Sequence, residues 1–226
     1  SFLNDLAVDS NRGFAYIADP ASPGHAAIIV VDLNTGESRR VLEGAMPLQP
    51  DIELDLVIDG EPVEVKTPDG QTIRPHVGIN PIALDATNEH LYFGPMHSTK
   101  HYRIETDPLR WEGYSASELL HQIEELPGER PISDGSSVDL AGNVYISDIG
   151  NNAIGILKPD GTYERLVQDE AVSWPDAFAF GPDGKLYVAV NQLHRGPVLN
   201  AGEDESKAPY LIIVVDGLPA PGIVGR

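Results

Sequence analysis

The sequence predicts an all-β protein, a β-propeller built of four-stranded antiparallel blades, for three reasons. A two-strand pattern occurs four times along the 226 residues, and in each copy the second strand is centred on a tyrosine. The chain contains 22 glycines and 19 prolines, which supply turns between many short strands. Repeats of about 40 to 55 residues with four antiparallel strands each are typical of propeller blades.

The four copies share a polar or proline-containing pair, a short apolar run, a turn and then the tyrosine strand. They are NDLAVDSNRGFAYIAD from Asn4, NPIALDATNEHLYFGP from Asn80, SDGSSVDLAGNVYISD from Ser133 and PDAFAFGPDGKLYVAV from Pro175. Their tyrosines are Tyr16, Tyr92, Tyr145 and Tyr187. Alternation of this kind favours buried strands over helices, and turns such as DLAGN and GPDGK are of hairpin type. Each copy is therefore predicted to begin with a β-hairpin.

A third strand is predicted after the hairpin in three copies, at residues 28–33, 153–158 and 211–216. In the first and third copies an NTG or PDG turn leads on to a fourth strand, which begins at Glu37 or Thr162. The remaining length is expected in connections between strands and blades, where a propeller tolerates insertions.

Three segments are longer than a blade requires. Residues 53–73 contain two Asp-Gly turns and are predicted to form an inserted hairpin or a small meander. Residues 115–126 are predicted to form the one short helix of the chain, because Ser115 and Glu118 have the spacing of a capping box. Residues 191–209 are predicted to be a long polar loop, and loops of that length are usually functional or mobile.

The whole chain, residues 1–226, is expected to be a single propeller domain. Four blades use all of the predicted strands and leave none to close a ring, and an open ring exposes sheet edges that promote aggregation. We therefore expect the chain to be part of a longer propeller.

The composition excludes several functional classes. The formal net charge of −20 does not favour binding to nucleic acid or to an anionic membrane surface. The absence of cysteine excludes disulfides, thiol catalysis and cysteine-ligated zinc. No apolar run approaches the roughly 18 residues of a membrane span, and residues 1–20 do not resemble a signal peptide. Serine-hydrolase, P-loop and dinucleotide-binding motifs do not occur.

A polar residue stands just before, or at the start of, the inner strand of each repeat, and in a propeller these positions converge at the mouth of the central channel. The residues are Asp5 (with Asn4), Asn80, Asp134 and Asp176. Their oxygen atoms suit a hard divalent cation, above all Ca²⁺. Without a cation, mutual repulsion would raise a carboxyl pKa and make Asp134 or Asp176 a candidate catalytic base. The structural alternative is that these side chains bond backbone N–H groups in Asx-turns.

A second pair of aspartates, Asp19 and Asp148, stands at the far end of the second strand in the first and third copies. Pro95 and Asn191 stand near the corresponding places in the other two copies. Since the chemistry is not maintained around the ring, turn formation is the role predicted for Asp19 and Asp148.

The histidines offer a rival site. His97 and His101 would lie on one face of an extended strand about 13 Å apart, which is too far to share a metal. His194 lies near Asn191 on the long loop, and both are predicted to reach the channel mouth as ligand-binding residues. His76 is a further candidate. For each histidine, an ordinary exposed position is the structural alternative.

Five stretches of the sequence carry a resemblance to a known family. They are LNDLAVD…GFAYIAD, VGINPIALDATNEHLYFGPMHSTKHYRI, PISDGSSVDLAGNVYISDIGNNAIG, SWPDAFAFGPDGKLYV and NQLHRGPVLNAGED. Over nearly its whole length the chain resembles the bacterial members of the major royal jelly protein and yellow family. The resemblance implies a six-bladed propeller, with about two further blades ahead of Ser1, and an extracellular or periplasmic location. Some insect relatives bind small amines or sterol-like ligands in the central channel, so a ligand of this kind is implied here. Tautomerase activity is associated with some members.

A more distant resemblance is to the gluconolactonase and senescence-marker propellers, which hold a divalent metal at the channel mouth with Glu, Asn and Asp. The similar positions here are Asn80-Pro81, Asp134-Gly135 and Pro175-Asp176-Ala177. Proline or alanine replaces the glycine of that motif in two of the three, and the metal-binding glutamate would precede Ser1. This resemblance implies a metal site at the polar ring, which this chain would show only in part.

Three functions remain open on the sequence alone. The leading hypothesis is a propeller that binds a small organic molecule through Asn80, Asp134, Asp176 and Asn191, with His194 nearby. The rival is a metal-dependent, lactonase-like hydrolase in which Asp134 or Asp176 activates water. The third is an interaction scaffold that needs no ligand in the channel.

Overall fold

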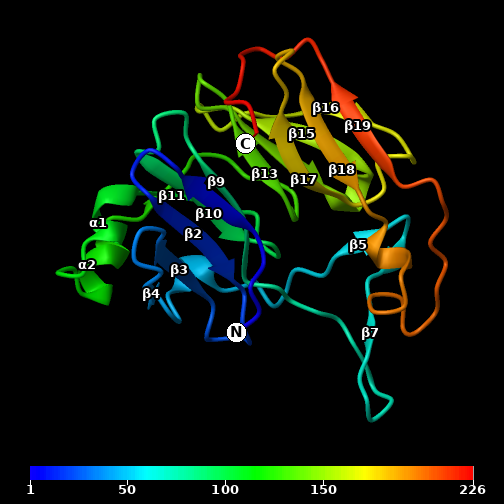
Figure 1. The fold of residues 1–226 in the computed structure, drawn as a ribbon. Helices are drawn as coiled ribbons and strands as arrows, with labels where there is room; N and C mark the ends of the chain where they lie inside the picture. Colours follow the sequence, from blue (N-terminus) through cyan, green and yellow to red (C-terminus); the bar gives the residue numbers. More distant parts are fainter. Residues whose placement is uncertain (226) are drawn as a thin grey trace.

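The computed structural model describes residues 1–225 and confirms the β-propeller architecture. Four antiparallel sheets stand side by side in chain order along an arc, with the first blade at one end and the fourth at the other (Figure 1). The inner strand of each blade packs against that of the next, β1 against β9, β9 against β13 and β13 against β17.

The strands follow the predicted repeat. The first blade consists of β1 (Leu6–Asp9), β2 (Phe14–Asp19), β3 (Ala27–Asp32) and β4 (Ser38–Val41). The second consists of β9 (Ile79–Leu84), β10 (His90–Pro95), β11 (Tyr102–Glu105) and β12 (Glu124–Glu125). The third consists of β13 (Ser136–Val138), β14 (Val144–Asp148), β15 (Ala153–Leu157) and β16 (Tyr163–Gln168). The fourth consists of β17 (Pro175–Phe180), β18 (Leu186–Val190) and β19 (Leu211–Val215), and no fourth strand joins it among residues 1–225.

The repeated tyrosines have a common place in the blades, because each pairs across the hairpin with a small residue. The pairs are Ala7 with Tyr16, Ala83 with Tyr92, Ser137 with Tyr145 and Ala179 with Tyr187. Tyr16 and Tyr145 are fully buried, and the ring of Tyr145 meets Phe180 of the next blade edge to face at 5.4 Å. Tyrosine rings therefore help to fill the space between blades, and the core consists of apolar layers between neighbouring sheets.

The predicted helix is present but shorter than expected, and it is not the only one. Helix α2 (Ala116–His121) begins at the predicted capping box of Ser115 and Glu118. It ends before residue 126 because Glu124–Glu125 pairs with β11 as the outermost strand of the second blade. The sequence analysis missed helix α1 (Thr106–Arg110). Both helices lie on the outer side of the arc (Figure 1), and neither is long and apolar enough to cross a membrane.

The insertion at residues 53–73 forms two small hairpins, one at each Asp-Gly turn. Strands β5 (Val57–Ile58) and β6 (Glu61–Pro62) make the first, and β7 (Val65–Lys66) and β8 (Thr72–Ile73) make the second. Three short 3₁₀ helices complete the described elements, η1 (Met46–Leu48), η2 (Ile149–Asn151) and η3 (Leu193–Arg195). The last lies in the predicted long loop at residues 191–209, which is otherwise without regular structure except for an isolated bridge at Asn200.

The insertion and the long loop pack on each other at one end of the channel (Figure 1). The N–H of Ala201 donates to the backbone oxygen of Glu64 at 3.2 Å, and Glu64 and Asn200 form an isolated β-bridge. Two segments that are far apart along the chain therefore form one wall above the inner strands.

Candidate functional site

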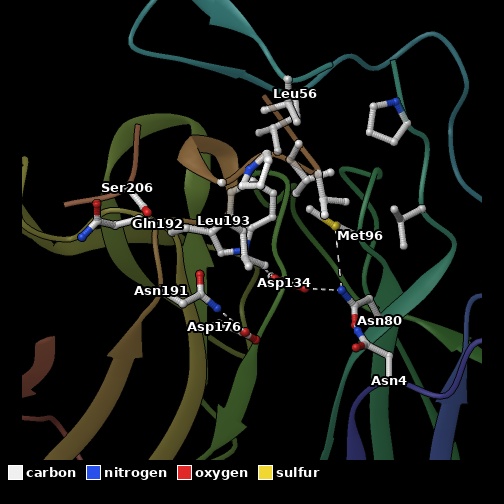
Figure 2. A pocket seen from close by; sticks show the side chains of 18 of the residues that line it. Asn4, Leu56, Asn80, Met96, Asp134, Asp176, Asn191, Gln192, Leu193 and Ser206 are labelled. Atoms are coloured by element: carbon white, nitrogen blue, oxygen red, sulfur yellow. Dashed lines mark hydrogen bonds between the residues drawn. The ribbon is translucent and has the colours of Figure 1, made fainter. Parts of the chain in front are cut away.

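Polar side chains from the starts of the inner strands meet at this end of the channel, as the repeat predicts. Asn4 donates from Nδ2 to Oδ1 of Asn80, and Asn80 donates from Nδ2 to Oδ1 of Asp134 (Figure 2). These three residues come from the first, second and third blades. The chain of hydrogen bonds thus links three blades across the channel mouth.

The two aspartates of the third and fourth blades are each held by a second donor. Trp174 donates its indole Nε1–H to Oδ2 of Asp134 at 2.5 Å, and Asn191 donates from Nδ2 to Oδ2 of Asp176 at 2.6 Å. Asp134 is only 5% exposed. Its carboxylate is therefore fixed in place between Asn80 and Trp174.

Gly135 explains how Asp134 and Asp176 come together. A Cβ at position 135 would lie 1.4 Å from the backbone oxygen of Asp176, so only glycine allows the starts of β13 and β17 to approach this closely. Ser147, which is fully buried in β14, accepts the N–H groups of Asp134 at 2.7 Å and Gly135 at 3.1 Å. Ser147 thereby positions the backbone of the aspartate at the channel mouth.

Burial and mutual repulsion control the charge of the carboxylates. Burial, together with the carboxylate of Asp176, raises the pKa of Asp134 to about 7, against the hydrogen bonds from Trp174 and Asn80. Burial raises the pKa of Asp5 to about 8, with contributions from Asp134 and Asp176. Burial also raises the pKa of Asp176. Near neutral pH the site therefore holds protons on its carboxyl groups or attracts a positively charged ligand.

A cavity of about 610 Å³ opens directly above these side chains. Asn80, Asp134, Asp176 and Asn191 line its base, while Leu56 and Met96 face it from higher up (Figure 2). Most of the lining is apolar and comes from the insertion, from the segment that joins it to β9 and from the long loop: Leu56, Val63, Pro75, Val77, Leu193, Pro197, Val198 and Leu199. No lysine or arginine of residues 1–225 lines the cavity. The carboxylates at its base consequently face a largely apolar space without a counter-charge.

Three other predicted site residues do not line this cavity. The charges of Asp134 and Asp176 contribute to the raised pKa of Asp5, but Asp5 does not line the cavity. His194 does not line it either, because its ring stacks on Trp174, with centroids 6.0 Å apart and planes 13° apart. His76 also lies outside the lining, and its Nε2 is 3.3 Å from Oδ1 of Asp55.

Asp19 and Asp148 have a further role besides the predicted turn formation. Both side chains are fully buried. Asp19 accepts from Arg40, and Asp148 accepts from Nε of Arg165 at 2.7 Å and from the hydroxyl of Tyr163 at 2.8 Å. Because these partners lie on β4 and β16, the aspartates connect the second strand of a blade to its fourth strand.

Two important residues of the site were missed by the sequence analysis. Trp174 is 2% exposed and has a left-handed backbone with φ of 58°, which is unusual for a bulky residue and is typical of functional sites. His97 lines the cavity, although only its distance from His101 was considered. The position of Trp174 directly before Pro175-Asp176 was the available signal, whereas nothing local to His97 indicates its place.

The polar ring does not by itself form a metal site of acidic and histidine ligands. Among residues 1–225, no group of three Asp, Glu, His or Cys side chains has an arrangement that could hold a metal ion. A cation at the channel mouth would therefore need the amide oxygen of Asn80 in addition to the carboxylates. That amide now accepts from Asn4 through its oxygen and donates to Asp134 through its nitrogen.

Comparison with known proteins identifies one family and several propellers. The model of the family described as major royal jelly protein matches residues 1–195. No curated protein matches the sequence. Among solved structures, a chain of a nidogen–laminin complex has a TM-score of 0.57 at 16% identity, covering 97% of this chain and 66% of that one.

Two enzymes with the same fold are also similar. A gluconolactonase from Xanthomonas campestris has a TM-score of 0.53 at 15% identity, with 84% of this chain and 54% of that one covered. A hydrazine synthase from Kuenenia stuttgartiensis has a TM-score of 0.53 at 12% identity, with 93% and 45% covered. The chain spans about half to two thirds of the length of these structures, and at such identities the likeness establishes the fold alone.

Proposed function

Because the chain belongs to the major royal jelly protein family, as its motifs predicted, we propose that it binds a small organic ligand at the channel mouth, and that this ligand is a protonated amine. The observation that carries the proposal is the pair of carboxylates, Asp134 and Asp176, at the base of a largely apolar cavity that no lysine or arginine of residues 1–225 lines. A cavity of about 610 Å³ is in the range of small-molecule sites. A positive charge on the ligand would favour the ionised form of both carboxylates.

The indole of Trp174 supports the same ligand class. It lines the cavity beside the carboxylates, and a cation near an aromatic face gains electrostatic stabilisation, most strongly at tryptophan. Apolar walls from the insertion and the long loop would cover the hydrocarbon part of an amine. On the family resemblance, we also propose an extracellular or periplasmic location, which fractionation of the source cells tests directly.

Calorimetric titration tests the proposal with primary amines and with neutral alcohols of the same size. Amines are expected to bind more tightly than their matched alcohols, and Asp176→Asn is expected to weaken amine binding about 10- to 100-fold, since hydrogen bonds to charged groups contribute roughly 1.5–3 kcal/mol. Asp183→Asn, in an exposed turn of the same blade, is the matched control. Equal affinity for amines and alcohols would contradict the proposal.

A lactonase-like hydrolase is the second candidate, and the repulsion between the carboxylates of Asp134 and Asp176 favours it. The pKa of Asp134 is raised to about 7 and the pKa of Asp176 is raised as well, and an ionised carboxylate can accept a proton from water. When bound, a divalent cation such as Ca²⁺ would polarise a lactone carbonyl. Asp134, Asp176 and Asn80, with Asp5 nearby, are the residues that would hold it.

Metal analysis and a panel of lactones separate the two candidates. The hydrolase requires stoichiometric metal in the purified protein and turnover that Asp134→Asn abolishes. Amine binding without metal, and no lactone turnover when Ca²⁺ is added, would leave the binding function alone.

A further inference from the structure

Asp204 is a third aspartate of the cavity, and it lies at the rim instead of the base. Its side chain lines the cavity from the long loop at residues 191–209 and is exposed to solvent. Asp134, at the base, is only 5% exposed. The long loop belongs to the wall above the inner strands (Figure 1), so carboxyl groups stand at two depths of one cavity.

Two consecutive residues, Asn191 and Gln192, connect the base of the cavity to this part of the rim. At the base, Nδ2 of Asn191 donates to Oδ2 of Asp176 at 2.6 Å. At the rim, Nε2 of Gln192 donates to the backbone oxygen of Lys207 at 2.7 Å, and its Oε1 accepts from the N–H of the same residue at 3.1 Å. Figure 2 shows Ser206, the residue before Lys207, on this side of the cavity. The two depths are therefore held in a fixed relation.

Ser206 holds the carboxylate of Asp204 in place. Oδ1 of Asp204 accepts the backbone N–H of Ser206 at 3.1 Å and its hydroxyl at 2.6 Å, and both residues line the cavity. These bonds hold the pKa of Asp204 below its usual value, and no cation of residues 1–225 contributes to this lowering. The side chain is thus an ionised, preorganised carboxylate that a ligand in the cavity can reach, because it is exposed.

The position of Asp204 distinguishes it from the general acidity of the loop. Glu203 and Glu205, on either side, are also exposed, but neither lines the cavity. The backbone N–H of Glu203 donates to the oxygen of Asn200 at 2.8 Å, and that of Glu205 donates to the oxygen of Arg195 at 2.7 Å. The turn that presents Asp204 to the cavity is therefore fixed on both sides by backbone hydrogen bonds.

We propose that the ligand carries a second positive charge, which Asp204 binds, so that the natural ligand is an α,ω-diamine or a longer polyamine. The proposal rests on the amine-binding function argued above and specifies the ligand further. One ammonium group binds the carboxylates of Asp134 and Asp176, the hydrocarbon chain lies along the apolar wall, and the second ammonium group binds at the rim. A monoamine makes the first contact and leaves Asp204 in water.

A series of α,ω-diamines and the ω-amino alcohols of equal length tests this selectivity by calorimetry at low salt. The best-fitting diamine is expected to bind about four- to tenfold more tightly than its matched amino alcohol: about twofold because either end can enter first, and roughly two- to fivefold from an exposed ion pair. Asp204→Asn removes the charge but keeps an oxygen that accepts from Ser206, and the preference is expected to fall to about twofold. Salt at about 1 M should have the same effect, because it screens exposed charges.

Glu203→Gln is the matched control, because it removes one negative charge from the same turn outside the cavity. The control is expected to keep the full preference for the diamine. A wild-type preference of no more than about twofold, a larger preference that survives in Asp204→Asn, or an equal loss in both variants overturns this inference alone. If diamines and amino alcohols bind no more tightly than the matched diols, the proposed function is overturned and this inference with it.

Discussion

Asp134 is in an environment that ordinary turn residues do not have. An Asx-turn would satisfy its oxygens with nearby backbone N–H groups. Instead, one oxygen accepts from Asn80 and the other from Trp174, which are side chains of the second blade and of the segment before β17. The residue therefore serves the site rather than its own backbone, and its raised pKa makes its charge sensitive to pH.

Amine binding is expected to weaken as the pH falls from about 8.5 to about 5.5. A carboxylate attracts the ammonium group only when ionised, and the pKa of Asp134 is raised to about 7 and that of Asp5 to about 8, so acidification neutralises them in this window. The loss is at most about one decade per pH unit for each proton taken up. Titrations at several pH values check this, and Asp134→Asn should flatten the dependence. Tighter binding at low pH would be inconsistent with the assignment.

Gly135 is expected to be required for the site. In Gly135→Ala the new methyl group would collide with the backbone of Asp176, so the starts of β13 and β17 must separate. We expect the free energy of unfolding to fall by about 1–3 kcal/mol and amine binding to be lost. Urea unfolding and calorimetry measure the two effects. Ser136→Ala, at the next position, removes a hydroxyl for which residues 1–225 supply no hydrogen-bond partner, and it should change neither.

Strand β16 is held by an ion pair to a buried carboxylate as well as by backbone hydrogen bonds. Within residues 1–225, no strand pairs with the outer edge of β16. Arg165 connects it to the buried Asp148 at the end of β14. Lys158 and Glu164 make a second pair near the same strand, but both side chains are substantially exposed. The two pairs allow a direct comparison of a buried with an exposed partner.

Arg165→Met is expected to destabilise the protein by about 1–3 kcal/mol, because it leaves the carboxylate of Asp148 buried without its cation; partial exposure of Arg165 keeps the loss below that of a fully buried pair. Lys158→Met should cost about 0–1 kcal/mol, as exposed pairs do. Hydrogen exchange of β16 amides and chemical unfolding measure both. Equal losses in the two variants would show that burial of Asp148 has no special effect.

The molecule as a whole depends on the apolar layers between blades. Phe180 is 1% exposed and packs against Tyr145 across the third and fourth blades. Asp134 and Asp176 come from the same two blades, so the layer that holds these sheets together also sets the spacing of the carboxylates. Stability of the fold and geometry of the site are consequently linked.

Phe180→Ala is expected to lower the free energy of unfolding by about 3–5 kcal/mol through the cavity that it leaves. For a chain of this size, the melting temperature falls by about 2–4 °C for each kcal/mol. Leu140→Ala, at a largely exposed position, should cost less than about 1 kcal/mol. Calorimetric melting of both variants provides the measurement, and similar melting temperatures would contradict the role of this layer.

Much of the fold could be predicted from the sequence, because hairpins depend on local alternation and turn residues. The four tyrosine hairpins are present, and so is the capping box of Ser115. The end of helix α2 was predicted too late, since Glu124–Glu125 is recruited by β11, a strand that lies about twenty residues earlier in the chain. Local propensity does not report such pairings.

The sequence by itself determined the repeat, the blades and the polar positions at the starts of the inner strands, since each follows from residues that are neighbours along the chain. Only the tertiary structure decided that Trp174 holds Asp134, that His97 rather than His194 lines the cavity, and that Gly135 allows two strands to touch. The physical reason is that each of these facts is a contact between residues far apart in sequence, and its geometry depends on how whole blades pack.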